Sequence, residues 1–271
     1  VLKAACVNPV LHYHLPIGLL QEGDDADFIV VKDLTNFKVL ETYINGLLVA
    51  KDGKTLIERV SSTIINQFDC KRVSMDDLAV AEQTYPSADG LIPVMEALDG
   101  QLITNKLTLP GTLVNGQWIS NTENDILKMV VVNRYHQAPV AKCFIKNMGF
   151  KKGAIASSVA HDSHNIVAVG VDDESLAAAI NLVIGERGGV SCYADANQQQ
   201  VLGLPVAGLM STQDGYKVAE AYTSIDRMAK ELGSTLQAPF MTLSFMALLV
   251  IPHLKLSDKG LFDGDRFELI S

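Results

Sequence analysis

Short apolar runs and turn dipeptides alternate along the first 60 residues. Apolar runs cover 28–31 and 39–44, Asn45-Gly46 follows directly, and a third run covers 47–50. An Asn-Gly pair between two apolar runs is a strong hairpin signal. We therefore expect a small antiparallel unit over 26–60. A sheet of this size is marginal alone, so the unit needs a packing partner.

Strand-like patterns predominate from residue 91 to residue 132. The predicted strands, separated by turn dipeptides such as Asn115-Gly116, are 91–98, 102–109, 113–119 and 126–132. Ahead of them, Ser74 and Asp77 have spacing similar to a capping box, just before an apolar stretch. This spacing predicts one helix near 75–84.

The last third of the chain mixes strands with two longer helices. Asp172 is positioned to cap a helix over 174–187, which Gly188-Gly189 ends, and a second helix over 216–232 ends at Gly233. The strands expected around them are 154–160, 166–171, 190–193 and 201–204. The fold class is therefore mixed α/β, with a mixed sheet and at least two helices in the C-terminal part.

The first residues have the pattern of a helix. The segment from Val1 to Val7 has no initiator Met and no N-cap residue, and Asn8-Pro9 follows as a stop signal. We interpret the segment as the last turns of a helix that begins upstream. The alternative is a frayed N-terminal helix of a complete protein.

Composition narrows the possible partners and the compartment. The chain of 271 residues carries 31 acidic and 22 basic residues, a net charge of −9, which argues against nucleic acid or an anionic membrane as partner. The apolar run 240–251 is too short for a membrane span, which needs about 20 residues. The four cysteines are scattered and predict reduced packing residues of a cytoplasmic protein rather than a zinc site; they are Cys6, Cys70, Cys143 and Cys192.

The most unusual stretch is 153–166, which reads GAIASSVAHDSHNI. Its first half consists mainly of small residues, which allow another backbone or a ligand to approach closely. Its second half places five polar residues between two apolar strands, namely His161, Asp162, Ser163, His164 and Asn165. Polar loops at strand ends often carry function. The residues alone leave open a functional loop, a hydrogen-bonded connector and, less favoured, a metal site at the two histidines.

Three other features receive structural interpretations. His12-Tyr13-His14 has the spacing of a metal-binding pair but lies outside any strand pattern, so we expect a surface turn. His136 and His253 are isolated and are expected to be structural. The segment 255–263 has charges of both signs and a Gly turn, which is typical of a solvated loop.

Four segments in order closely resemble the C-terminal domain of bacterial adenine deaminases. They are Gly153–Ile166, Leu204–Ser211, Pro239–Phe245 and Lys255–Phe262. Residues 1–60 are similar to the end of an amidohydrolase, because Gly23–Val30 resembles the entry to its small β-sandwich. The resemblance implies three parts: 1–60 with the end of a barrel helix and a β-sandwich portion, 61–138 as a mostly β connection, and 139–271 as the C-terminal α/β domain.

The family resemblance also implies an activity. Members hydrolyse adenine to hypoxanthine and ammonia with a divalent metal (Mn, Fe or Zn) held in a (β/α)8 barrel of about 250 residues. None of those metal ligands maps to this sequence, so we expect the barrel to precede Val1 and this chain alone to be inactive and metal-free. The expected partners are adenine, the missing barrel and a second copy in a homo-oligomer.

The five polar residues of 161–165 are the substrate-side candidates, expected to face the barrel mouth; no residue of the chain is assigned a catalytic role. The competing hypothesis is a non-catalytic binding or regulatory module derived from such an enzyme.

Overall fold

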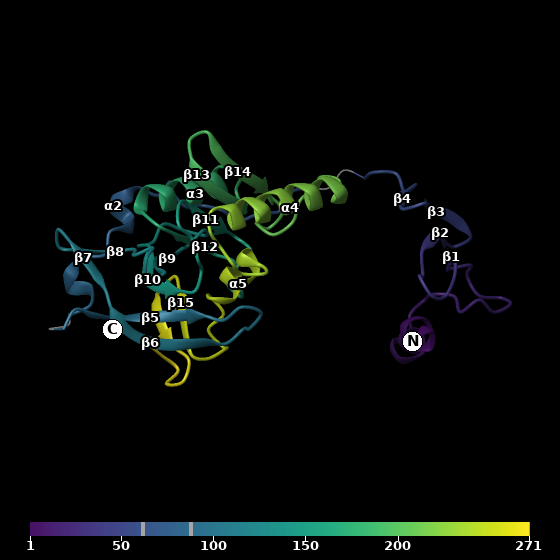
Figure 1. The fold of residues 1–271 in the computed structure, drawn as a ribbon. Helices are drawn as coiled ribbons and strands as arrows, with labels where there is room; N and C mark the ends of the chain where they lie inside the picture. The colour runs from purple at the N-terminus through teal and green to yellow at the C-terminus, as the bar shows by residue number, and fades with distance from the viewer. Residues whose placement is uncertain (61–62, 87–88, 271) are drawn as a thin grey trace. The chain divides into compact units, whose positions relative to one another are not determined.

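Two units make up the chain in the computed structural model, and each is described by itself. The structure describes residues 1–60, 63–86 and 89–270. The first unit is Val1–Ser62 and the second is Thr63–Ser271 (Figure 1). The expected domain boundary at 60/61 adjoins residues 61–62, which lie outside the described residues.

The first unit begins with a helix that continues past the expected stop. A π-helical turn, η1 (Lys3–Val7), leads directly into α1 (Asn8–Tyr13). The prediction that Asn8-Pro9 ends the helix is wrong, because Pro9 lies in the first turn of α1, where no intrahelical bond is required of its nitrogen. His12 therefore lies in a helix and not in a surface turn. The helix ends at His14, whose φ is 52°.

The sheet of the first unit agrees with the predicted strands. It contains β1 (Phe28–Val31), β2 (Val39–Ile44), β3 (Leu47–Lys51) and β4 (Lys54–Thr55), paired antiparallel in chain order. The hairpin predicted at Asn45-Gly46 is confirmed, since both residues have positive φ. Within the described residues this unit has a single sheet, and no side chain of residues 1–60 is buried.

An eight-stranded mixed sheet forms the centre of the second unit. Its order is β14-β13-β11-β12-β9-β10-β5-β6, in which β10 and β5 run parallel and the other neighbours are antiparallel. The mixed α/β class is thereby confirmed. The strands are β5 (Leu91–Ala97), β6 (Thr104–Pro110), β9 (Ile126–Val132), β10 (Ala141–Lys146), β11 (Ala154–Ser157), β12 (Ile166–Gly170), β13 (Gly189–Asp195) and β14 (Gln198–Gly203).

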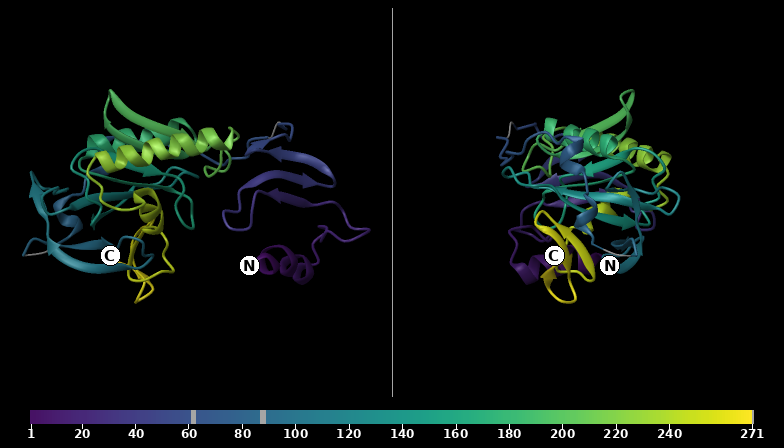
Figure 2. Two further views of the ribbon diagram at one scale, coloured as in Figure 1. Left: turned by 45° about the vertical axis from the view of Figure 1, so that its right-hand side comes forward. Right: turned by 90° about the vertical axis from the view of Figure 1, so that its left-hand side faces the viewer.

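Helices cover both faces of this sheet. Successive strand residues point to opposite sides, so strands with apolar residues at successive positions present apolar side chains to both faces. On one face α3 (Asp173–Gly185) and the short α2 (Met75–Leu78) pack over Ala154 and Ala156. On the other face α4 (Gly215–Glu231), α5 (Pro239–Phe245) and a C-terminal hairpin share one core cluster with Ile155. In Figure 2 the C-terminal hairpin, in yellow, lies away from α4, in yellow-green.

Capping residues explain where the predicted helices begin. The Asp172 carboxylate accepts a hydrogen bond from the Ser175 amide at 2.7 Å, which confirms the predicted cap of α3. The helix predicted near 75–84 is shorter than expected. The capping box of Ser74 and Asp77 is present, but α2 ends at Leu78 and a 3-10 turn, η2 (Glu82–Thr84), follows separately.

The C-terminal segment differs most from its prediction. Residues 254–263 form a hairpin of β15 (Leu254–Ser257) and β16 (Gly260–Asp263), with β17 (Glu268–Leu269) at its edge. The expected solvated loop is wrong, because Leu254, Lys255 and Leu256 are all fully buried. Helix α5, which lies just before this hairpin, was not predicted. The strand predicted over 113–119 is a separate small hairpin of β7 (Thr112–Val114) and β8 (Gln117–Ile119).

The expected boundary at 138/139 falls between β9 and β10, which are neighbours in one sheet. The described residues on its two sides therefore share a single fold. No helix in the described part of the chain is long and apolar enough to cross a membrane.

Candidate functional site

The four segments that resemble adenine deaminases meet in space, although they are far apart in the sequence. Ser158 lies at the end of β11, Gly208 in the loop after β14, and Lys255 in the C-terminal hairpin. Three hydrogen bonds connect the segments in pairs: Ser158 Oγ to Gly208 O at 2.6 Å, His161 N to Ser244 O at 3.1 Å, and Lys255 Nζ to Phe245 O at 3.0 Å.

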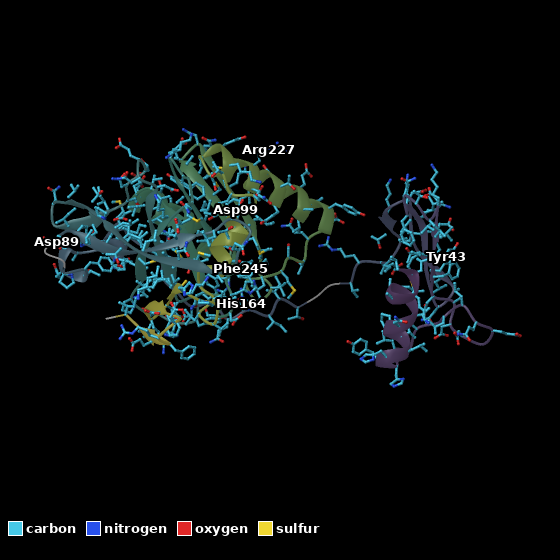
Figure 3. All side chains as sticks on the ribbon, turned by 60° about the horizontal axis from the view of Figure 1, so that its bottom comes forward. Tyr43, Asp89, Asp99, His164, Arg227 and Phe245 are labelled. Carbon is cyan, nitrogen blue, oxygen red and sulfur yellow. The ribbon has the colours of Figure 1, made fainter. Side chains whose placement is uncertain are left out.

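The candidate loop, residues 161–165, connects β11 to β12. His161 is half-buried, and its ring stacks on Phe245 with 4.9 Å between centroids and 17° between planes. Asp162 and Ser163 are exposed. Figure 3 labels His164 and Phe245, which lie near each other in the second unit. The structure thus places the apolar ring of Phe245 beside the polar residues of the candidate loop.

His164 has an unsatisfied polar atom. Its Nδ1 is buried and has no hydrogen-bond partner among the described residues. Its backbone is held in the left-handed region, with φ of 53°, by a bond from its amide to Ala160 O at 2.7 Å. Burial, and then repulsion from His161, lower the pKa of His164. The imidazole is therefore neutral near pH 7, with one nitrogen that donates and one that accepts.

Asn165 and Arg134 hold the far end of the loop. Asn165 is buried, and its Oδ1 accepts a hydrogen bond from the Arg134 amide at 3.2 Å. The Tyr135 hydroxyl donates to Ser163 O at 2.8 Å. These bonds connect the loop to the end of β9, so the backbone of the loop is fixed at both ends.

Arg134 is a buried cation without a carboxylate among its hydrogen-bond partners in the described residues. Its guanidinium donates to four neutral oxygens, namely Asn66 Oδ1, Gln67 O, Tyr135 Oη and Ala207 O. A Cβ at Gly208, where φ is +70°, would lie 2.8 Å from Arg134 Nη1, so glycine makes room for the guanidinium. Sequence reasoning did not single out Arg134, because its acceptors come from distant segments.

Lys255 is a second buried cation near the loop. It is fully buried, and its ammonium group donates to Phe245 O at 3.0 Å and Leu102 O at 2.6 Å. Burial lowers the pKa of Lys255 to about 8. At the turn of the same hairpin, Asp258 accepts a hydrogen bond from Asn133 at 2.8 Å. The hairpin thus contacts the end of α5 through Lys255 and the segment after β9 through Asp258.

An apolar cavity of about 430 Å³ adjoins the loop. Ser157, Val159 and Ser244 contribute to its wall, together with Tyr222 and Phe240. Among the described residues that line the cavity none is charged, and its polar lining groups include the hydroxyls of Ser157, Ser244 and Tyr222.

The described residues contain no group of three or more His, Cys, Asp or Glu side chains that would hold a metal. The hypothesis of a separate metal site at His161 and His164 therefore has no third ligand to support it. The cysteines are all free; Cys143 and Cys192 are buried as expected, whereas Cys6 is exposed.

Comparison with known proteins agrees with the family resemblance of these segments. The profile of the adenine deaminase C-terminal domain matches residues 101–268. The chain is 49% identical to the adenine deaminase of Salinibacter ruber over 272 residues and 49% identical to that of Methanosarcina barkeri over 277 residues. It is 46% identical to that of Borreliella burgdorferi over 269 residues. These alignments cover 98–100% of this chain and 48–49% of the relatives.

The second unit is thus a mixed α/β domain of the kind found at the C-terminus of a deaminase. The chain belongs to the adenine deaminase family. It spans about half the length of the curated relatives it matches.

Proposed function

We propose that the complete protein hydrolyses adenine to hypoxanthine and ammonia, and that this chain is its C-terminal portion. The observation that carries the proposal is the match to proteins named adenine deaminase over essentially the whole chain. The divalent metal (Mn, Fe or Zn) would activate water in a barrel outside this chain. The residues described here do not fit a metal site, so this chain's role is to help bind and enclose the substrate.

The candidate loop, 161–165, provides the chemistry that a purine needs. Adenine presents ring nitrogens that accept hydrogen bonds and an exocyclic amine that donates them, so its pocket requires both kinds of partner. The neutral His164 imidazole supplies one donor and one acceptor, and its Nδ1 is unpartnered within the described residues. Ser163 can donate or accept, and the exposed Asp162 carboxylate accepts.

The loop is preorganised for such contacts. Its backbone is tied to Ser244 at His161 and to Ala160 at His164. At its far end, Asn165 accepts a bond from the Arg134 amide. A loop that is already ordered loses less conformational entropy when a ligand binds. We propose that it faces the barrel mouth and closes over adenine.

The exposed apolar surface of the first unit supports the proposal that this unit packs against other protein. Its strands carry exposed apolar side chains, among them Ile29, Val30, Val39, Ile44 and Leu47. Apolar surface of this kind favours burial against other protein. We propose that the unit packs against the barrel of the complete protein, which forms a homo-oligomer. Sedimentation of the complete protein as a stable monomer would contradict the oligomer.

The test of the loop is His161→Ala and His164→Ala, made separately in the complete protein. We expect kcat/KM to fall by about one to two orders of magnitude, with unchanged melting temperature and metal content. His12→Ala is the matched control, because this exposed histidine lies on α1, outside the loop. Wild-type kinetics in both loop variants, or a loss explained by unfolding, would refute the role of the loop.

The test of the metal assignment uses the 271-residue chain alone. Assayed with added Mn²⁺, Fe²⁺ or Zn²⁺, it should not deaminate adenine, because the described residues group no set of metal ligands. Turnover above background, in a sample free of the complete enzyme, would show that the chemistry resides in this chain after all.

A further inference from the structure

Lys255 is an unusual choice for a core position. Its side chain is fully buried on β15 between Leu254 and Leu256, which are also fully buried. Its hydrogen-bond partners are backbone carbonyls, at Leu102 and Phe245, and no carboxylate pairs with it in the described part of the chain. Burying an unpaired ammonium group is costly, and an apolar side chain of similar size would avoid that cost. The cost of this burial directs attention to the groups that the ammonium group contacts.

The ammonium group holds the end of α5. Phe245 is the last residue of this helix, and carbonyls of a final helical turn lack intrahelical partners. The Phe245 carbonyl is satisfied from outside the helix, by the Leu248 amide at 3.2 Å and by the Lys255 ammonium group at 3.0 Å. A cation placed there is also favoured by the helix dipole. A second bond supports the same contact, since the Leu256 amide donates to Met246 O at 3.0 Å. The hairpin strand β15 thus fixes the C-terminal end of α5 at two successive carbonyls.

The end of α5 in turn supports the candidate loop. The Phe245 ring stacks on the His161 ring at 4.9 Å between centroids. One residue earlier, Ser244 O accepts the hydrogen bond of the His161 amide at 3.1 Å. A displacement of the last turn of α5 would therefore change both the backbone and the ring position of His161. Lys255 contacts Phe245 directly, and Phe245 in turn contacts His161.

We propose that Lys255 is a positioning residue for the candidate loop, 161–165, which it holds in place through the end of α5. The proposal rests on the proposed function, in which this loop binds adenine. Lys255 itself does not touch the substrate. Its removal should release the last turn of α5 and let the loop move, which weakens substrate binding without disrupting the central sheet.

The experiment is Lys255→Met in the complete protein, because methionine fills the space of the lysine stem without its charge. Hydrogen–deuterium exchange followed by mass spectrometry is measured on peptides that cover 159–165, 241–246 and, as a reference, 126–132. We expect about tenfold faster exchange in the first two peptides and unchanged exchange in the reference. We also expect kcat/KM to fall about tenfold, mainly through KM, since small displacements of a binding loop have effects of this size.

Lys106→Met is the matched control. Lys106 also connects β6 to the C-terminal hairpin, but its ammonium group pairs with the Asp263 carboxylate and not with α5. We expect this variant to leave the exchange of 159–165 and the KM unchanged. Should Lys255→Met fail to fold, Lys255→Gln takes its place, because glutamine removes the charge and shortens the side chain while its amide can still donate to one of the two carbonyls, and the same exchange pattern is expected.

The outcomes separate the inference from the proposed function. Wild-type exchange in 159–165 overturns the positioning role, and so does faster exchange in all three peptides, which would indicate a general loss of stability. Faster exchange confined to 159–165 and 241–246 supports the positioning role. If that local change occurs with wild-type kcat/KM, then Lys255 positions the loop but the loop does not bind adenine.

Discussion

The two units form strands from the same kinds of residues, yet they bury them to very different degrees. Val30 in β1 of the first unit is 38% exposed, whereas Val130 in β9 of the second unit is fully buried. Both valines lie in antiparallel strand pairs, although a register shift follows Val30 in β1. The difference shows that strand formation follows the local pattern, while burial depends on what packs against the strand.

The two Asn-Gly hairpins give the same result on a smaller scale. Asn45-Gly46 connects β2 to β3, and Leu48, two residues after the glycine, is only half-buried. Asn115-Gly116 connects β7 to β8, and Trp118, two residues after the glycine, is 3% exposed. The turn chemistry is identical, but Trp118 packs with Val80 and Ile92 in a core cluster. Equal local signals therefore lead to unequal contributions to stability.

The largest expected effect of this difference is on core truncation. Phe144 is fully buried in β10, so Phe144→Ala should lower the free energy of unfolding by about 3–5 kcal/mol. Leu47→Ala in the first unit should change it by no more than about 0.5 kcal/mol. Urea denaturation followed by circular dichroism measures both. Similar losses from the two variants would show that the first unit also has a core.

A second prediction concerns lysines with pKa values shifted in opposite directions. Burial lowers the pKa of Lys255 from 10.5 to about 8, so between these values the unfolded chain binds more protons than the folded protein. This group therefore makes the free energy of unfolding rise with pH from about 8 to 10.5, and the gain is lost as pH falls through 8. In the first unit, the hydrogen bond to Glu41 raises the pKa of Lys51, so its contribution is lost as pH rises above 10.5.

The measurement compares wild type with Lys255→Met by urea denaturation at several pH values from 7 to 10. The stability of the wild type should increase relative to the variant as the pH rises. Subtracting the variant cancels the titration of other groups. A constant difference across the range would show that the pKa of Lys255 is not lowered by folding.

A third prediction concerns helix capping, which is present in only one of the compared helices. The Asp172 side chain caps α3, whereas α1 has no side-chain cap. Asp172→Ala should therefore lower the free energy of unfolding by about 1 kcal/mol, while Asp172→Asn should retain most of the stability. Thermal denaturation of the two variants distinguishes them. An equal loss in both would assign the effect to charge and not to the cap.

The smallest expected effect is at the exposed ion pair of the first unit. Lys51 and Glu41 lie 2.9 Å apart, and the lysine side chain is 54% exposed. Exposed ion pairs add little to the free energy of unfolding, because water and salt screen the charges. Lys51→Met should leave the urea midpoint unchanged at neutral pH. A clear decrease would mean that this face of the sheet is covered in the protein as it exists in solution.

Local rules were sufficient for much of the fold. The strands of the first unit, the Asn-Gly turns, the Asp172 cap and the two longer helices follow from residue patterns within a few positions. The four family segments were also identifiable from the sequence, since each is a continuous run. Where a local signal was overridden, as at Asn8-Pro9, the residue type was compatible with both outcomes, because proline suits the first turn of a helix.

The sequence by itself determined most of the strands and the two longer helices, though not α5 or the C-terminal hairpin. It also determined that five polar residues, 161–165, share one loop. Only the tertiary structure decided which distant residues pack around this loop. Strand alternation places Lys255 opposite its leucine neighbours and would predict exposure, yet α5 and Leu102 cover it. Arg134 finds its acceptors in residues 66–67 and 207, far away in the chain. Such contacts depend on packing between distant elements, which no local pattern records.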